Sequence, residues 1–168
     1  LGPDFTARFA RERQIQARLT HPLIARLIDA GVDGHTPWLA MELIRGEHAV
    51  AFAQAHALPI AARLKLVEDV AGAVDYAHRQ LIVHRDIKPS NVLVDESGTP
   101  HLLDFGIAKL LEPGEATELT ASDMRVMSPM YAAPEQFRGE PITTATDVYA
   151  LGLLLYELLT GQLPHGRR

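Results

Sequence analysis

The sequence contains no cysteine among its 168 residues, so disulfide bonds and thiolate metal sites are excluded. It also lacks an apolar run long enough to cross a bilayer, because the longest one, YALGLLLYELL at 149–159, is short and contains Glu157. Basic residues are not in excess either, and the net charge of −5 argues against nucleic acid as a partner. The chain has no signal peptide and does not begin with Met, so we expect it to be a fragment of a longer protein.

What is present is typical of one globular domain, with 47% hydrophobic and 22% charged residues. Apolar residues at helical spacing predict helices over 6–19 and 59–79, and a strongly apolar stretch ended by Gly161 and Pro164 predicts a third over 145–160. Short apolar runs predict strands over 23–33 and 38–44, the second of them buried, and a hairpin made of 91–95 and 101–106. The polar segment 112–130 predicts a long loop, and a loop of this length inside a domain is more often functional than idle.

The second predicted helix can be described further. Pro59 suits its first turn, and the residues expected on its buried face recur every three or four positions. They are Ile60, Leu64, Val67, Val70 or Ala71, and Val74.

A short segment, VHRDIKPSN at 83–91, brings an acid, basic residues and an amide together around a proline. Asp86 is followed by Lys88 and Asn91, and the predicted hairpin would return Asp104 to the same place. An isolated Asp in a loop is usually a turn former, so the hypothesis depends on the whole group. Carboxylate and amide oxygens suit Mg²⁺, a lysine suits a phosphate, and a second aspartate can accept a proton from a hydroxyl. These are the requirements of phosphoryl transfer.

Three motifs, HRDIKPSN at 84–91, DFG at 104–106 and APE at 133–135, together resemble the signature set of protein kinases. The lysine two residues after Asp86, Lys88, resembles the pattern of serine/threonine kinases. The sequence around ATDVYALGLLLYELLTG looks most like the bacterial, eukaryotic-like (Hanks-type) members of the family. The resemblance implies an α+β, protein-kinase-like fold that is incomplete at both ends. Residues 1–40 would be a remnant of the smaller N-terminal lobe with its regulatory helix, 41–47 the hinge, and 48–168 part of the larger, mostly helical lobe.

The resemblance also implies a role for each residue of the group. Asp86 would receive the proton of the substrate hydroxyl, Lys88 would steady the γ-phosphate of ATP, and Asn91 and Asp104 would hold Mg²⁺. The backbone C=O of Glu42 and N–H of Ile44 would meet the adenine edge, with Leu93 packed beneath the base.

Further residues acquire regulatory or structural roles by the same resemblance. Arg85 beside the catalytic aspartate suggests control by loop phosphorylation, since a phosphate can pair with its guanidinium. Thr117, Thr120 and Ser122 are the candidate acceptors, although each alone reads equally well as an ordinary polar loop residue. Glu12 would pair with the ATP-binding lysine, and Met41 would be the gatekeeper. His84 would support Phe105, which belongs to the DFG motif with Gly106, and Ser128 would lie near the catalytic aspartate. Glu135 would pair with an arginine farther along the chain, and Asp147 would hold the backbone of the catalytic loop.

The sequence also departs from the family pattern. It lacks the G-x-G-x-x-G loop and the strand with the V-A-I-K-type lysine, which belong before residue 1, and the helices expected after residue 161. We therefore expect these residues alone to bind ATP weakly, to have little transferase activity and to be poorly stable, because the apolar face of 145–160 would be exposed. Gln16 stands where the family's hydrophobic spine has an aliphatic residue, and a buried amide without partners costs about 1–3 kcal/mol.

The leading hypothesis is an ATP- and Mg²⁺-dependent serine/threonine protein kinase, represented by an incomplete domain. The alternative is a non-catalytic kinase-like scaffold, either a pseudokinase or a truncated gene product; it gains support only from the missing lysine and glycine-rich loop. A small-molecule phosphotransferase is disfavoured by the APE motif and the long loop. We expect protein substrates with Ser or Thr acceptors, and self-phosphorylation or dimerisation is compatible with this function. We also expect a cytoplasmic location, which would equally suit the cytoplasmic domain of a membrane-anchored full-length protein.

Overall fold

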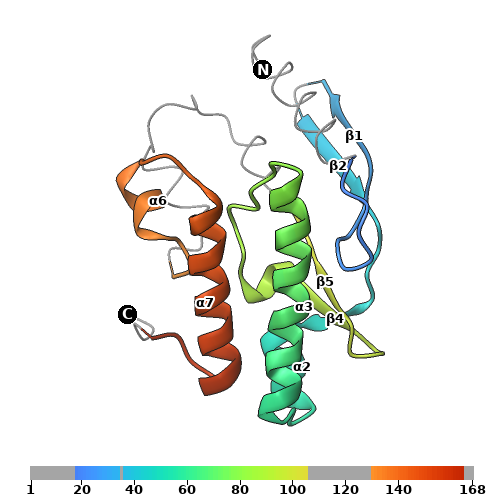
Figure 1. Ribbon diagram of the computed structural model, residues 1–168. Helices are drawn as coiled ribbons and strands as arrows, with labels where there is room; N and C mark the ends of the chain where they lie inside the picture. The colour runs from blue at the N-terminus through green and yellow to red at the C-terminus, as the bar shows by residue number, and fades with distance from the viewer. Residues whose placement is uncertain (1–17, 35, 106–129, 165–168) are drawn as a thin grey trace.

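The computed structural model describes residues 18–34, 36–105 and 130–164, and its helices and strands give the predicted α+β class (Figure 1). Two small antiparallel sheets are combined with a layer of helices. In chain order the elements are β1 (Leu27–Asp33), β2 (Thr36–Met41), β3 (Gly46–His48), α2 (Ala49–Ala55), α3 (Ile60–Arg79), the 3-10 turn η1 (Pro89–Asn91), β4 (Val92–Asp95), β5 (Pro100–Leu102), α6 (Pro134–Arg138) and α7 (Thr144–Thr160).

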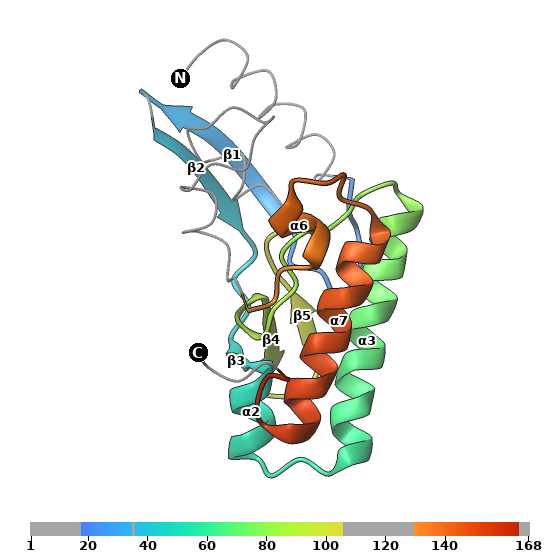
Figure 2. The same cartoon turned by 90° about the vertical axis from the view of Figure 1, so that its left-hand side faces the viewer.

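Strands β1 and β2 form a hairpin that extends past the second sheet on the side away from α2 (Figures 1 and 2). Leu27 pairs with Met41 at one end and Asp33 with Thr36 at the other. Gly31 lies opposite Trp38, and a Cβ at Gly31 would come within 2.7 Å of the Trp38 ring. The glycine therefore leaves room for the indole to lie across the neighbouring strand.

The second sheet has the order β3-β4-β5, and it carries the predicted hairpin around Gly98. Its β5 edge is extended by residues 23–25, because Ala25 N–H donates to Leu102 O at 3.0 Å and Leu102 N–H donates to Leu23 O at 2.8 Å. The chain entering β1 is thus tied to the strand that precedes Asp104. This sheet is the support for the hairpin ends discussed below.

Helices α3 and α7 pack side by side and cover the second sheet together with α2 (Figure 2). Between them and the sheet lies the core, which includes Val70 of α3, Leu154 of α7, and Val92 and Leu102 of the sheet. Burying one such side chain stabilises the fold by roughly 1.5–3 kcal/mol relative to leaving it exposed. The loop between α3 and β4 contributes two residues, Ile82 and Ile87, to this core.

Helix α7 begins and ends with the residue types that its sequence predicts. The Thr143 hydroxyl accepts from Ala145 N–H, and the Thr146 hydroxyl accepts from Thr143 N–H, both at 3.3 Å. At the other end Gly161 adopts φ 78°, which glycine tolerates best, and its N–H donates to Glu157 O at 2.8 Å. These caps fix where the helix starts, and hence where Asp147 lies in its first turn.

The predicted apolar face of the second helix was wrong in its first turns. Ile60 and Leu64 are exposed, whereas the buried face runs along Leu66, Val70, Ala73, Val74 and Ala77. In the first turns the side chain that points towards α7 is Arg63, which donates to Leu58 O at 2.8 Å and to Leu158 O of α7 at 2.6 Å. Pro59 is the N-cap of α3 and precedes its first turn.

The expectation of a buried strand over 38–44 was also wrong. The strand ends at Met41, Trp38 is 41% exposed and Leu43 is 79% exposed. In the described part of the chain, this two-stranded sheet has no layer of helices over it, so its apolar residues are not enclosed.

No helix in the described ranges combines the length and apolarity that a bilayer crossing requires.

Candidate active site

The segment 82–91 is fastened to α7 by one carboxylate. Asp147, with its side chain 1% exposed, accepts from His84 N–H at 2.8 Å through Oδ2 and from Arg85 N–H at 2.9 Å through Oδ1. A third partner comes from α3, where His78 Nε2 lies 2.7 Å from Oδ2. Hydrogen bonds to a charged acceptor contribute about 1.5–3 kcal/mol each, so the loop's backbone is held firmly at these two residues.

His84 is fully buried, and its ring connects the loop to the strand end beyond β5. Asp86 N–H donates to Nδ1 at 3.2 Å, so Nδ1 is an acceptor, and Nε2 lies 2.7 Å from Leu103 O, which can only accept. This pairing requires the neutral ring with its proton on Nε2. Burial lowers the pKa of His84, and the nearby charges of Asp147, Asp86 and Asp104 oppose that shift only in part.

Asp86, Lys88 and Asn91 form a hydrogen-bonded cluster on the same loop. The Asp86 Oδ2 atom lies 2.7 Å from Lys88 Nζ and accepts from Asn91 Nδ2 at 3.1 Å. Asn91 Nδ2 also donates to the Asp86 backbone O at 2.8 Å, which orients the amide. Of the three residues, only Asn91 is buried, while Asp86 and Lys88 are partly exposed. The sequence prediction that these three side chains lie together therefore agrees with the geometry.

Asp104 follows strand β5, at the other end of the β4–β5 hairpin from Asn91. The residue before it, Leu103, is hydrogen-bonded to Asn91. Leu103 N–H donates to Asn91 O at 2.8 Å, and Asp104 follows with φ 55° and an exposed side chain. The His84 ring contacts the residue before Asp104 through Leu103 O and contacts Asp86 through its N–H, so it joins the two chain segments that carry these carboxylates. Among the described residues no group of three or more His, Cys, Asp or Glu side chains could hold a metal, so any ion here would depend on Asn91, water or a substrate for further oxygens.

Phe105 packs beside this cluster. Its ring is buried, and its centroid lies 4.6 Å from that of His84 at an interplanar angle of 53°. Such a tilted pair is a favourable aromatic geometry. His84 therefore supports Phe105 directly, as its neighbour in the core.

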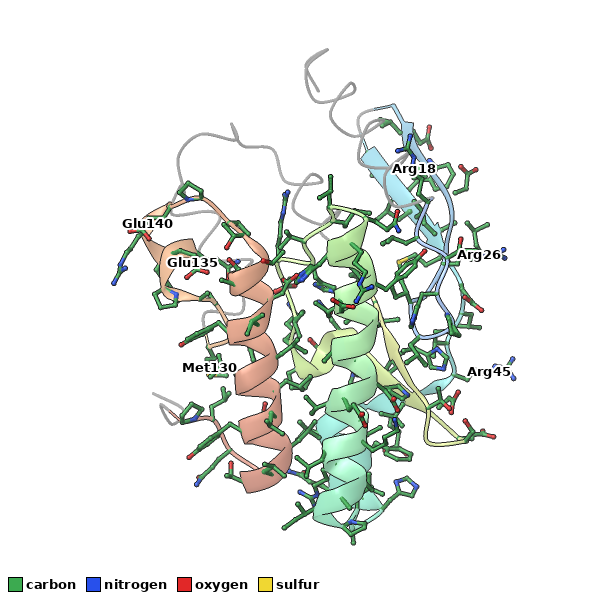
Figure 3. All side chains as sticks on the ribbon, in the orientation of Figure 1. Arg18, Arg26, Arg45, Met130, Glu135 and Glu140 are labelled. Atoms are coloured by element: carbon green, nitrogen blue, oxygen red, sulfur yellow. The ribbon has the colours of Figure 1, made fainter. Side chains whose placement is uncertain are left out.

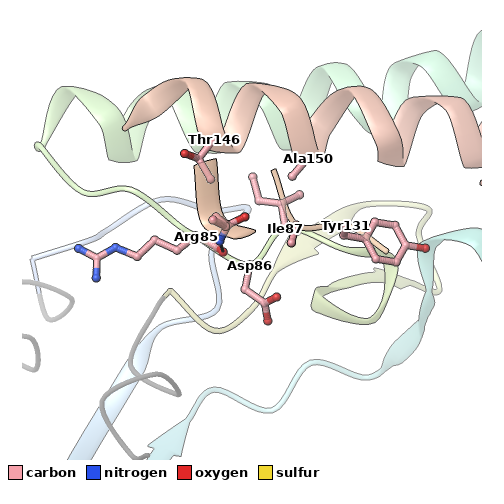
Figure 4. A pocket seen from close by; sticks show the side chains of 8 residues that line it. Arg85, Asp86, Ile87, Tyr131, Thr146 and Ala150 are labelled. Atoms are coloured by element: carbon pink, nitrogen blue, oxygen red, sulfur yellow. Dashed lines mark hydrogen bonds between the residues drawn. The ribbon is translucent and has the colours of Figure 1, made fainter. Parts of the chain in front are cut away.

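A second group of contacts surrounds Arg85 and Asp86 from the side of α6 and α7. A small pocket there is lined by residues of the loop, of 131–136 and of α7, including Asp86, Tyr131 and Thr146 (Figure 4). Tyr131 donates a hydrogen bond to Glu157 of α7. The Asp86 carboxylate and the Arg85 side chain extend in different directions from the loop (Figure 4).

Glu135 of the APE motif has a partner within the described chain. Its Oε1 accepts from the Thr146 hydroxyl at 2.6 Å, which lowers the pKa of Glu135, with a further contribution from the charge of Arg138. Glu135 and Glu140 lie on the α6 side, across the molecule from Arg26 and Arg45 (Figure 3). This bond joins α6 to the first turn of α7 in the described chain, and the arginine partner expected for Glu135 stays a prediction.

The sequence matches the family described as protein kinase domain over residues 3–168. The chain belongs to the protein kinase family. Its relatives are named serine/threonine kinases, which are enzymes, and the family uses ATP with Mg²⁺ and acts on protein substrates.

Two curated relatives and one solved structure illustrate how far the kinase similarity extends. Serine/threonine-protein kinase PkaA of Streptomyces coelicolor is 44% identical over 169 residues, which cover 97% of this chain and 30% of that protein. Serine/threonine-protein kinase PrkC of Bacillus subtilis is 38% identical over 162 residues, covering 96% of this chain and 24% of the relative. The PknI kinase domain of Mycobacterium tuberculosis has a TM-score of 0.77 at 33% identity, covering 99% of this chain and 62% of that domain. The chain thus spans less than a third of these relatives and less than two thirds of the solved kinase domain.

In this kinase the residues predicted to meet adenine lie where β2 ends. Met41 is half-buried and pairs with Leu27, and Glu42 N–H donates to Arg26 O at 2.9 Å. Within the described ranges, the Glu42 C=O and the Ile44 N–H make no backbone hydrogen bond. Leu93 lies in β4 and is only partly buried, so part of its side chain is available to a neighbour.

Several predicted kinase residues lie outside the described residues. They are Glu12, Gln16, Gly106, Thr117, Thr120, Ser122 and Ser128.

Sequence reasoning missed three residues that hold this site together: His78, Gln136 and Thr146. His78 lies 69 positions from its partner Asp147, and only the packing of α3 against α7 brings the two together. Gln136 follows the APE motif directly, but a glutamine in a short helix carries no signal of what it contacts. Thr146 could have been recognised as a capping residue of α7, although its bond to Glu135 could not.

Proposed function

We propose that the protein containing this chain transfers the γ-phosphate of ATP to serine or threonine hydroxyls of protein substrates. The observation that carries the proposal is the cluster of Asp86, Lys88 and Asn91, with Asp104 joined to it through the Leu103–Asn91 backbone link. Phosphoryl transfer needs little covalent chemistry from the protein but demands positioning and charge neutralisation. A cluster whose members orient one another provides that positioning.

In this proposal Asp86 accepts the proton of the substrate hydroxyl. Its Oδ2 atom is already engaged by Lys88 and Asn91, whereas no described residue hydrogen-bonds to Oδ1. We therefore assign the acceptor role to Oδ1. A general base of this kind contributes about 10²–10⁴-fold to the rate. Lys88 lies close enough to Asp86 for its ammonium to reach the phosphoryl group that the hydroxyl attacks, and it would offset the negative charge there.

The donor set fits Mg²⁺. Asn91 uses its Nδ2 for Asp86, which leaves Oδ1 as the free amide oxygen, and the exposed Asp104 carboxylate makes no hydrogen bond to another described residue. Both are hard oxygen ligands, and Mg²⁺ is commonly bound through one or two such groups plus phosphate oxygens and water. The ion would draw charge away from the phosphates when bound. Asn91 and Asp104 are the residues that would hold it.

The nucleotide and regulatory assignments belong to the same proposal. The Glu42 C=O and Ile44 N–H, which make no backbone hydrogen bond among the described residues, would receive the adenine edge, Leu93 would lie beneath the base, and Met41 would be the gatekeeper. We likewise assign 41–47 to the hinge, 1–40 to the smaller lobe and 48–168 to the larger one. Glu12, Arg85 and the acceptors Thr117, Thr120 and Ser122 keep their proposed regulatory roles.

The test is phosphate transfer by the complete protein that contains this chain, with Asp86→Asn and Asp104→Asn as variants. Asp86→Asn should lower kcat by about 10²–10⁴-fold and leave nucleotide affinity nearly unchanged, because only proton transfer is affected. Asp104→Asn should raise the Mg²⁺ concentration needed for activity. The matched control is Asp75→Asn on the exposed side of α3, which should retain full activity.

The outcome that contradicts the proposal is a wild-type protein that binds no Mg²⁺–ATP and transfers no phosphate. Binding of a protein partner by that inactive wild type would favour the non-catalytic scaffold. Equal activity of wild type and Asp86→Asn would show that the proton acceptor has been misassigned.

A further inference from the structure

We propose that Gln136 is a positioning residue for Asp86, because its side-chain amide joins the start of α6 to the backbone that carries the Asp86 carboxylate. This inference rests on the proposed function, which gives Asp86 its role. It adds a residue that none of the kinase motifs discussed above includes.

The Gln136 amide uses both of its ends. The side chain is 4% exposed, its Nε2 donates to Arg85 O at 3.0 Å, and its Oε1 accepts from Ala133 N–H at 2.9 Å. Since one partner can only accept and the other can only donate, the two ends cannot exchange. Gln136 therefore makes a defined bridge between residue 133 and the catalytic loop.

The bridge ends on a peptide whose orientation determines that of Asp86. Arg85 has φ 72°, a left-handed conformation that is unfavourable for residues other than glycine and must be held by its surroundings. The Arg85 C=O and the Asp86 N–H belong to one planar peptide unit. Gln136 binds that unit on one side, and His84 Nδ1 accepts from it on the other at 3.2 Å. Rotation of this peptide would break both bonds and turn the Asp86 side chain.

The other end of the bridge lies in the segment that lines the pocket beside Asp86. Tyr131, Ala132 and Gln136 line this pocket together with Arg85 and Asp86 (Figure 4). The bridge therefore connects one wall of this pocket to the peptide that carries Asp86.

The variant Gln136→Glu tests the bridge because it keeps the shape and the bond from Ala133 N–H, but sets a carboxylate oxygen against Arg85 O. At pH 7.5 kcat should fall by about tenfold, with a smaller change in KM for the peptide, because the base is misoriented while the substrate site persists. Burial raises the pKa of a carboxyl, and a protonated Glu can donate to Arg85 O again. The deficit should therefore shrink as the pH is lowered towards about 6, a recovery that general destabilisation would not give.

The charged and titratable groups near position 136 include both signs. They are Arg85 and Asp86 on the loop, Tyr131 on the preceding segment, Glu135 and Arg138 on α6, and Asp147 and Glu157 on α7. Two further variants separate their influence from that of the bridge. Gln136→Met removes both bonds without adding charge, so its kcat should be reduced at every pH. Gln54→Glu makes the same charge change at an exposed position of α2, a helix at the opposite end of the helical layer from α6, and should behave as wild type (Figure 1).

Hydrogen exchange of residues 84–87 in the complete protein gives a readout that does not require activity. Exchange there should be faster in both Gln136 variants than in wild type and Gln54→Glu. If the wild type transfers no phosphate but this difference is found, the bridge stands and the proposed function fails. If the wild type is active and neither kcat nor exchange differs in the Gln136 variants, the bridge is refuted and the proposed function stands. Recovery of Gln136→Met at low pH would also refute it.

Discussion

The substitution Asp147→Asn should loosen the loop 82–91 from α7 while keeping the size of the side chain. Asp147 accepts three hydrogen bonds, from His84 N–H, Arg85 N–H and His78, and it is almost completely buried. An asparagine retains one oxygen and turns an NH₂ group towards donors. At least one backbone N–H of the loop must then lose its partner in a largely buried place, which is costly.

The cost follows from that count. Losing a hydrogen bond to a charged acceptor costs about 1.5–3 kcal/mol, and a buried N–H left without a partner adds about 1–3 kcal/mol. We expect the free energy of unfolding to fall by about 3–5 kcal/mol in total, as in other cases where one member of a buried charged network is removed. For a domain of this size such a loss lowers Tm by roughly 10 °C.

Urea unfolding of the complete kinase domain would measure this loss. The midpoint should fall while the m-value is unchanged, since the surface exposed on unfolding stays the same. The matched control is Asp75→Asn: Asp75 pairs with Arg79 on the surface, its side chain is 62% exposed, and its loss should cost no more than about 0.5 kcal/mol. Equal midpoints for Asp147→Asn and Asp75→Asn would refute the reasoning. The reasoning would also be refuted if hydrogen exchange in Asp147→Asn were faster than in wild type in α7 but unchanged in residues 84–85.

Three further predictions concern stability. Hydrogen bonds from Ser97 and from His101, with those of the turn backbone, keep the pKa of Asp95 well below its usual value. The ionised carboxylate therefore stabilises the fold above about pH 4, and this stabilisation is lost as the pH falls. Asp95→Asn should destabilise the protein at pH 7 by about 1–2 kcal/mol, and the urea midpoints of the two proteins should converge in acid. Arg63→Met should cost about 1–3 kcal/mol, because it leaves the Leu158 and Leu58 carbonyls without their donor, whereas Arg79→Met on the surface should be nearly neutral in the same thermal-unfolding assay. Gly46→Ala should prevent β3 from pairing normally, since the added Cβ would lie 2.3 Å from Val94 O. Gly72→Ala should instead stabilise α3 by about 0.5–1 kcal/mol, because a Cβ there has nothing within 4 Å. A Gly46→Ala protein as stable as wild type would contradict the first of these two predictions.

The loop and hairpin of the site were predictable from the sequence because their signals are local. Residues 83–91 carry their chemistry in one short stretch, and the turn around Gly98 indicates that the chain returns. A hairpin of fixed register then places Asp104 beside Asn91 without any knowledge of the rest of the fold. Of the two long helices, α3 was predicted from its apolar periodicity, although not the face of its first turns, and α7 from a strongly apolar stretch that ends at Gly161.

What the sequence did not predict depends on contacts between distant segments. The inward face of α3 begins with Arg63 because the carbonyls of Leu58 and Leu158 lie there, and no local pattern indicates them. Trp38 reads as a core residue, but its hairpin has no covering layer in the described chain. Short elements such as β3, α2 and α6 carry too few residues for periodicity, and tertiary packing determines them.

The shared carboxylate of Asp147 has a consequence for movement. Because the N–H groups of two successive loop residues bind the same buried side chain, the loop and the first turn of α7 must shift as one body or not at all. Any conformational change of this protein is therefore expected at parts with fewer hydrogen bonds, such as the exposed Asp104 that follows the hairpin. The backbone at residues 84 and 85 would then keep its position relative to α7 during such a change.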